Sequence, residues 1–173
     1  ALTKGRGLDC NRISGGIKNI YFAVFDQVTS IPQTAGEITD LEMGTNDLYK
    51  YVMPLGVSSL TDTIVGSREN GTIYYTPTCN IILNRLTKED QNQIKLLGAT
   101  KTIIFAELNE TLLSSGNNVI VGLGSVNGME LNAGTMDSGA SWGDRNGYTL
   151  TFDGMEALPF AMVADYTTTP FDN

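Results

Sequence analysis

The 173-residue chain is predicted to fold mainly as β-structure, in a β-sandwich or barrel of two packed sheets with one short α-helix. Short runs of alternating apolar and polar residues recur along the chain, and Gly-rich corners separate them. Helix start and stop signals occur together only between residues 87 and 98. Hydrophobic residues make up 41% and charged residues 17% of the chain, a balance typical of a globular protein.

The length predicts a single β-sandwich domain, which we place at residues 17–164. Residues 1–16 combine charged side chains and four glycines without periodicity, so they are predicted to form a flexible N-terminal arm. Residues 165–173 are predicted to form a C-terminal arm. Residues 30–47 are polar and rich in breakers of regular structure, which predicts a long loop or an irregular hairpin.

The first strand is predicted at residues 18–29, where apolar side chains on both faces indicate a central strand covered from both sides. The run 48–57 resumes a strand, which Pro54 breaks. Residues 73–83 alternate clearly, and Pro77, which has no N–H, predicts an edge or a bulge in that strand. One face of this strand is predicted to carry Ile73, Tyr75, Cys79, Ile81 and Leu83.

The one helix is predicted to begin at Thr87 as N-cap, with Asp90 three residues later in a near capping box. Ile94 and Leu97 supply its apolar face, and Gly98 is predicted to end it as the residue after the last helical turn. Five further strands are predicted after the helix, at residues 101–107, 119–123, 126–131, 148–153 and 158–164.

Charge is distributed very unevenly along the chain. The first 101 residues contain ten acids and ten bases, whereas Thr102 to Asn173 contain nine acids and one base, Arg145. The whole net charge of -8 therefore arises in the last segment. This separation suggests a surface with a function, and it argues against tight binding to nucleic acid. The nine acids are Glu107, Glu110, Glu130, Asp137, Asp144, Asp153, Glu156, Asp165 and Asp172.

Several functional classes are excluded or disfavoured by composition. The chain has no His, which excludes Ser-His-Asp and Cys-His nucleophiles and His-ligated metals. Its two cysteines, Cys10 and Cys79, cannot form a structural zinc site by themselves, and a disulfide between them is the minor alternative to a buried Cys79 thiol. No carboxylate pair stands out as a catalytic acid and base, so we expect no enzyme and no cofactor. We also expect no signal peptide and no transmembrane helix.

Two glycine-containing motifs have simple interpretations. Residues 122–128, GLGSVNG, are followed by a strand-like run rather than a helix, which favours turn glycines over a dinucleotide fingerprint. Residues 143–147, GDRNG, lack the alternating ligands of a calcium loop. They favour a hairpin connection in which Asn146-Gly147 supplies positive φ angles.

The run from Gly128 to Pro159 resembles the C-terminal part of phage major tail tube proteins. The pieces that carry the resemblance are NGMEL, DRNGYTLTF and GMEALPF. In the last piece, Gly154, Glu156 and Pro159 match a G-x-E-x-x-P close. The order of strand, short helix and strand around residues 87–98 is also similar to the tube fold. The resemblance implies a sandwich that closes into hexameric rings, and rings that stack into a hollow tube through which DNA passes. Contractile tails, siphovirus tails and type VI secretion tubes share this architecture.

The resemblance implies a structural virion protein of the tail, made in the cytoplasm of a host bacterium. Its partners would be further copies of itself, with sheath, tape measure, baseplate and terminator proteins. An acidic lumen would repel DNA and keep the duplex from sticking. The acids expected to line that lumen are Glu130, Asp137, Asp144 and Asp153. The residues expected in arms and loops that contact other subunits are Arg6, Arg12, Glu37, Asp40, Asp165 and Phe171.

Two other functions stay open at the level of sequence. One is a different virion β-protein, such as a capsid decoration or head–tail completion protein, which forms discrete rings or trimers. The other is a secreted carbohydrate-binding sandwich, which predicts an exposed aromatic platform drawn from Trp142, Tyr148 and Tyr166. For Trp142 the simpler interpretation is an interface residue or a turn residue packed against its own hairpin.

Overall fold

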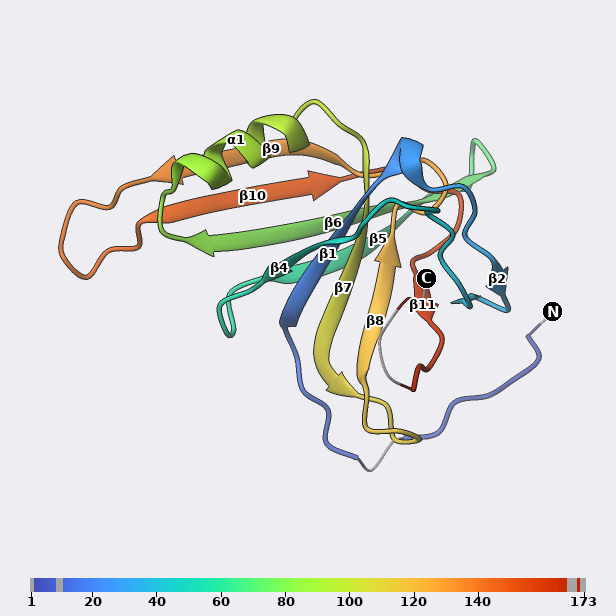
Figure 1. The fold of residues 1–173 in the computed structure, drawn as a ribbon. Coiled ribbons are helices and arrows are strands. Elements are labelled where there is room, and N and C mark those ends of the chain that lie inside the picture. The colour runs from blue at the N-terminus through green and yellow to red at the C-terminus, as the bar shows by residue number, and fades with distance from the viewer. Residues whose placement is uncertain (1, 9–10, 168–170, 172–173) are drawn as a thin grey trace.

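Two packed β-sheets and one α-helix make up the fold, in a computed structural model that describes residues 2–8, 11–167 and 171 (Figure 1). A seven-stranded sheet has the order β2-β3-β11-β8-β7-β1-β4, and a four-stranded sheet has the order β5-β6-β10-β9. The predicted mainly-β class with one short helix is therefore confirmed. Cys10, and with it the alternative of a disulfide to Cys79, lies outside the described residues.

The strands of the seven-stranded sheet are β1 (Ile17–Val24), β2 (Gln33–Thr34), β3 (Glu37–Ile38), β4 (Tyr49–Val52), β7 (Thr102–Thr111), β8 (Asn118–Leu123) and β11 (Ala161–Val163). Those of the four-stranded sheet are β5 (Ser59–Ser67), β6 (Thr72–Asn84), β9 (Glu130–Asp137) and β10 (Gly147–Asp153). A single 3₁₀ turn (Phe25–Gln27) follows β1. All pairs are antiparallel except the short β3–β11 contact.

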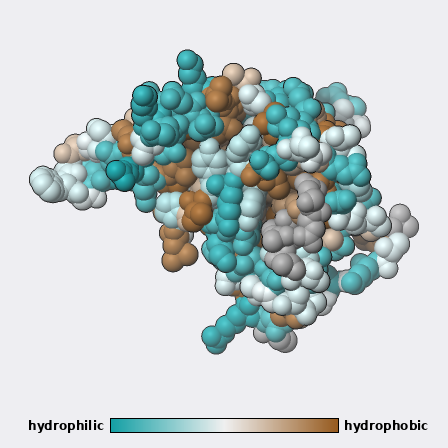
Figure 2. All heavy atoms as spheres, in the orientation of Figure 1, coloured by the Kyte–Doolittle hydropathy of each residue, from teal (hydrophilic) through white to brown (hydrophobic). Residues whose placement is uncertain are grey.

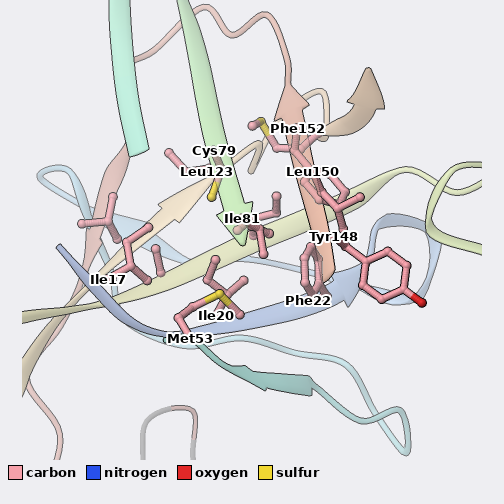
Figure 3. Close-up of a cluster of buried hydrophobic side chains, with 14 of the residues drawn as sticks. Ile17, Ile20, Phe22, Met53, Cys79, Ile81, Leu123, Tyr148, Leu150 and Phe152 are labelled. Atoms are coloured by element: carbon pink, nitrogen blue, oxygen red, sulfur yellow. The ribbon is translucent and has the colours of Figure 1, made fainter. Parts of the chain in front are cut away.

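The main hydrophobic core lies between the two sheets (Figure 3). Ile20 and Phe22 of β1 meet side chains of β6 and β10, and the rings of Phe22 and Phe152 are 5.2 Å apart. Burial of these apolar side chains stabilises the sandwich, since each fully buried Leu, Ile or Phe contributes roughly 1.5–3 kcal/mol. The predicted alternation of β10 is confirmed, because Tyr148, Leu150 and Phe152 are all buried.

A second core covers the opposite face of the seven-stranded sheet. Ala23, Ile103 and Phe105 point to this side, and the segment between β1 and β4 lies over them. Within that segment, Leu41 and Met43 are fully buried. The segment predicted as a loop or irregular hairpin thus forms the short β2–β3 hairpin and a third layer. This layer explains why β1 is apolar on both faces, as predicted for a covered central strand.

The helix α1 (Lys88–Leu97) begins as predicted. The Thr87 hydroxyl oxygen accepts the Asp90 N–H at 3.1 Å and donates to the Asp90 carboxylate at 2.6 Å. Its end differs from the prediction, because Gly98 has a right-handed conformation with φ -68° and is itself the C-cap. The chain therefore needs no left-handed glycine to leave the helix.

Several strands differ from the predictions. Strand β1 ends at Val24 rather than at residue 29, because Phe25–Gln27 form the 3₁₀ turn, and β4 covers only Tyr49–Val52 of the predicted 48–57. Strand β5 was not predicted, because few of its side chains are apolar and none is fully buried. Strand β9 begins at Glu130 rather than at residue 126, since residues 124–128 form a turn, and it continues to Asp137. Strand β11 covers only Ala161–Val163 of the predicted 158–164.

The edge or bulge predicted at Pro77 is not found, because β6 is a central strand between β5 and β10. The register of β6 with β5 runs without interruption through Pro77, which lies opposite Asp62. Pairing of β6 with β10 stops one residue earlier, at Thr78. Just past the end of β10, the Pro77 carbonyl accepts the Gly154 N–H, so the N–H that Pro77 lacks would have faced Gly154 and this pair keeps a single hydrogen bond.

Candidate functional site

The outward face of the four-stranded sheet is flat and polar. Because Tyr148, Leu150 and Phe152 point into the core, their neighbours Thr149, Thr151 and Asp153 point outward. The strand registers extend this face across all four strands. Its side chains are Ser59, Thr61 and Thr63 from β5, Thr76, Thr78, Asn80 and Ile82 from β6, Thr149, Thr151 and Asp153 from β10, and Glu130, Ala133, Thr135 and Asp137 from β9. We call this set of residues the polar face.

The polar face has acids but no bases. The four strands contain Asp62, Glu130, Asp137 and Asp153, and no Lys or Arg. Two cations reach it from outside the strands. Lys101 forms an exposed ion pair with Glu130 at 3.7 Å, and Arg145 donates to the Thr149 hydroxyl at 2.6 Å. Because these two cations offset part of the charge of Glu130, Asp137 and Asp153, the face is only weakly electronegative.

Hydrogen bonds between neighbouring side chains fix the polar face. Thr151 donates its hydroxyl to the Asn80 side chain at 2.9 Å, which links β10 to β6. Asn132, the extra residue at a β-bulge in β9, donates to the Asp153 carboxylate at 2.7 Å. These contacts hold short side chains in place across neighbouring strands.

The four acids predicted for a lumen fall into two pairs. Glu130 and Asp153 lie directly opposite each other on β9 and β10. Asp137 ends β9, and Asp144 follows in the loop between β9 and β10. At about 3.3 Å per strand residue, the two pairs are roughly 20–25 Å apart. The structure therefore brings the acids to the two ends of the β9–β10 ribbon, with threonines and an alanine between them.

The loop at residues 138–146 projects beyond the body of the protein, at the far left of Figure 1. The Asp144 carboxylate accepts the N–H groups of Ser141 at 2.8 Å and Ala140 at 3.0 Å, and these hydrogen bonds lower the pKa of Asp144. Trp142 in this loop is completely exposed, so it does not pack against its own hairpin. An exposed indole of this size is typical of a surface that contacts another protein.

The predicted Asn146-Gly147 turn is wrong. Neither residue has a positive φ angle, and Gly147 is the first residue of β10. The connection is a loop of several residues, in which Gly139 supplies the positive φ of 68°. Gly147 is needed for close packing instead, because a Cβ atom there would lie 2.0 Å from the Leu83 carbonyl oxygen.

The four-stranded sheet has two open edges, β5 and β9. The Pro77 carbonyl accepts the Gly154 N–H, so the hydrogen-bonding groups of Pro77 point away from β5. In an antiparallel pair, its partner Asp62 then also points its N–H and C=O away from β6. Because backbone groups alternate in direction every second residue along a strand, Leu60, Ile64 and Gly66 also point their N–H and C=O groups away from β6. Strand β5 thus presents a row of backbone groups that can pair with another strand.

The residues predicted for arms and loops lie in two places. Arg6 and Arg12 are exposed on the N-terminal arm, which has no helix or strand in its described residues, and Glu37 is exposed on β3. Asp40, Asp165 and Phe171 come together, because all three line one concavity of about 370 Å³. We call it the acidic concavity.

Contacts within the chain hold two walls of the acidic concavity. The Asp165 carboxylate accepts hydrogen bonds from Ser114 at 3.1 Å, Ser115 at 2.7 Å and Asn117 at 3.0 Å. These hydrogen bonds lower the pKa of Asp165, so the group stays ionised. Phe171 packs its ring against Phe105, with 4.6 Å between centroids. Phe171 was predicted to contact another subunit, but part of its ring packs against the core of its own chain.

Glu156 has a structural role that sequence reasoning missed. Its carboxylate is buried and accepts the Asn127 N–H at 3.0 Å, with further hydrogen bonds from the N–H groups of Val126 and Gly128. Its backbone exchanges two hydrogen bonds with Tyr75 of β6. Gly154 lies close by, and a Cβ atom there would meet the Gly128 carbonyl at 2.8 Å. The G-x-E pattern therefore fastens the turn between β8 and β9 to β6. A lone acid inside an apolar run was the available signal.

A second buried acid, Glu107, lies in β7 on the seven-stranded sheet. It accepts hydrogen bonds from Asn19 at 2.7 Å and Tyr21 at 3.1 Å, and Lys18 lies 3.8 Å away. Burial, and then the nearby Glu107 charge, raise the pKa of Tyr21 far above its usual range. The contacts of Glu107 with Asn19, Tyr21 and Lys18 explain how its carboxylate is accommodated at a buried position.

The aromatic platform considered for carbohydrate binding does not form. Tyr148 is buried, and its hydroxyl donates to the Thr87 carbonyl at 3.0 Å, so it anchors the start of α1. Trp142 lies in the projecting loop, and Tyr166 lies beside the acidic concavity. Three rings placed in this way cannot stack together on a sugar.

No protein-family model, curated protein or solved structure matches this chain. Among the described residues, no helix is long and apolar enough to cross a membrane. The same residues contain no group of three or more acids and cysteines arranged to hold a metal ion.

Proposed function

We propose that this protein is a tail tube subunit of a phage-type tail, which assembles into stacked rings around a hollow conduit for DNA. One observation carries the proposal. The polar face spans four strands and has acids and short polar side chains without a single Lys or Arg in those strands. In this proposal the polar face lines the conduit.

A wall whose strands carry no Lys or Arg suits a conduit because DNA binds proteins mainly through these two residues. Neutralised phosphates release counterions, and a few such contacts give strong binding at moderate salt. Threonine, serine and asparagine hydrate well, and they offer no positive charge that would hold the duplex. The acids at the two ends of the β9–β10 ribbon repel phosphate over a screening length of about 8–10 Å.

Ring closure follows from the two open edges of the same sheet. Pairing of β5 of one copy with β9 of the next is a head-to-tail contact, which closes into a ring when the rotation between copies fits. Such pairing would continue the polar face from one copy to the next. Both edges are eight or nine residues long, which is long for an unprotected edge.

Apolar side chains at projecting sites support contacts between copies. Figure 2 shows hydrophobic residues on a protrusion in the region of the loop between β4 and β5. There Val52 and Leu55 are strongly exposed, and Val57 is partly exposed. Together with Trp142 at the other projecting loop, they provide apolar surface that a monomer would leave in water.

The second candidate is a capsid decoration or head–tail completion protein. It uses the same open edges to form a single ring or a trimer. The length of the assembly separates the two functions, because a decoration or completion protein stops at one ring, whereas a tube subunit continues along an axis.

Reversal of two acids tests which face lines the conduit. Tubes of the Glu130→Lys/Asp153→Lys variant are mixed with short duplex DNA and imaged by electron microscopy. We expect DNA density on the tube axis at about 50 mM salt and its loss at about 200 mM salt, because phosphate contacts depend steeply on salt. Wild-type tubes should show no axial DNA.

The matched control is Asp26→Lys/Glu89→Lys, which adds the same charge at exposed positions away from the polar face. Its tubes should leave the axis empty. If the test variant binds DNA only on the outside of the tube, or the control variant fills the axis equally, the polar face does not line the conduit.

A further inference from the structure

The N-terminal arm and the acidic concavity have complementary chemistry. Described residues of the arm include three cations, Lys4, Arg6 and Arg12, and two fully exposed leucines, Leu2 and Leu8. No ion pair in the described part of the chain involves any of these cations. The described part of the arm is therefore a basic, partly apolar segment.

The acidic concavity matches that segment in charge and in polarity. It is formed by residues 38–40, residues 163–167 and Phe171, and it combines the carboxylates of Asp40 and Asp165 with apolar contacts from Val163 and Phe171. The chain has no Lys or Arg between Lys18 and Lys50, and none after Arg145. Both segments that form the concavity are thus free of competing cations.

We infer that the N-terminal arm of one copy binds in the acidic concavity of a second copy. Arg6 and Arg12 would pair with Asp40 and Asp165, and a guanidinium suits this role because it binds carboxylates in a planar fork and stacks on aromatic rings. Leu8, which lies between the two arginines, would cover the apolar part of the concavity. The inference rests on the proposal that the chain self-assembles, and it names one contact of that assembly.

The arm is long enough to reach another copy. Its last residues are fixed to the body, because Asn109 donates its side-chain N–H to the Gly15 carbonyl at 3.0 Å and its backbone N–H to Gly16 at 3.1 Å. The residues before this anchor can extend by about 3.3–3.6 Å each, so Arg6, which lies nine positions before Gly15, can reach roughly 30 Å from it. That distance is comparable to the diameter of a domain of this size.

Charge reversal in the full-length chain tests the contact. One variant reverses the arm (Arg6→Glu/Arg12→Glu). The other reverses Asp40 of the concavity and its near neighbour in sequence Glu37 (Glu37→Arg/Asp40→Arg), and it leaves the hydrogen-bonded Asp165 in place. The concentration at which half of the protein assembles is measured by sedimentation velocity. Each variant should raise this concentration at least about tenfold, because like charges then face each other at the contact. Circular dichroism and thermal melting check that both variants are folded.

An equimolar mixture of the two variants identifies the partner of the arm. Each reversed arm then meets a reversed concavity on a different chain, so assembly should return to within about threefold of wild type. Charge reversal at Glu89→Arg, on α1, is the matched control and should change nothing. If a chain with all four substitutions assembles normally but the mixture does not, the arm binds its own body and the inference is overturned. It is equally overturned if either reversal leaves assembly unchanged.

The same experiment separates this contact from the proposed function. Suppose that wild-type protein forms discrete oligomers, that each variant loses them and that the mixture forms them again. The arm contact then stands and the tube function fails. If wild-type protein forms tubes that neither reversal weakens, the tube function stands and the arm contact fails. Wild-type protein that stays monomeric at every concentration overturns both.

Discussion

At the scale of single residues, Glu156 connects the resemblance motif to physical chemistry. Its carboxylate accepts hydrogen bonds from the turn between β8 and β9, while its backbone pairs with β6. Burial raises its pKa, and the N–H donors oppose that shift only in part. The folded protein therefore holds this proton more tightly than the unfolded chain does.

The raised pKa of Glu156 predicts a pH-dependent stability. For an acid whose pKa rises on folding, stability is greatest below its unfolded pKa and falls as pH rises through its folded pKa. Urea unfolding is measured from pH 4 to pH 7 for wild type and Glu156→Gln, which cannot ionise at this position. The free energy of unfolding of wild type relative to the variant should fall as pH rises from the ordinary glutamate pKa upward. A difference that rises over this window contradicts the assignment.

At the scale of elements, strands were predicted most accurately from the sequence where burial imposes an alternating or continuously apolar pattern. Strands β6, β7, β8 and β10 alternate or run apolar because the core selects their side chains. Strand β9 was misplaced because nearly all its side chains are exposed, so its only signal is backbone pairing with β10. Strand β5 was missed for a similar reason, since its apolar Ile64 is largely exposed.

The candidate site was predictable in part. The uneven distribution of charge along the chain identified the acids as candidates, because charge can be counted directly from the sequence. Which face each acid occupies depends on registers and on the bulge at Asn132, and these arise from long-range pairing. The grouping of Asp40 with Asp165 and Phe171 also depends on tertiary structure, because 125 or more positions separate the segments. The error at Asn146-Gly147 also arises from tertiary structure, because Gly147 is required by its close contact with the Leu83 backbone and not by a turn.

The open edge of β5 gives a prediction for an element. A proline at Ile64 removes an N–H that points to the open edge and leaves the ladder with β6 intact. We expect Ile64→Pro to remain folded in thermal melts and to lose assembly in sedimentation. Thr63→Pro is the contrasting variant, because it removes a hydrogen bond to β6 and should reduce stability by about 1 kcal/mol or more.

Ile64→Val is the matched control, since it keeps the edge N–H and should assemble like wild type. Normal assembly of a well-folded Ile64→Pro protein would show that rings do not close through β5.

At the scale of the whole molecule, three sets of surfaces have separate roles in the proposed assembly. The strands of the polar face contain no Lys or Arg, which suits a conduit wall. The edges β5 and β9 suit ring closure, and the basic arm and the acidic concavity suit a contact between copies. In this proposed assembly, Glu130 and Asp153 would face DNA, and Asp40 and Asp165 would face the cationic arm.

Electron microscopy of the purified full-length protein, concentrated in steps, tests the central claim most directly. The account predicts hollow tubes with a regular axial repeat, and six subunits in each ring when the tubes are viewed along their axis. A protein that stays monomeric at every concentration, or that stops at a single ring or trimer, contradicts it.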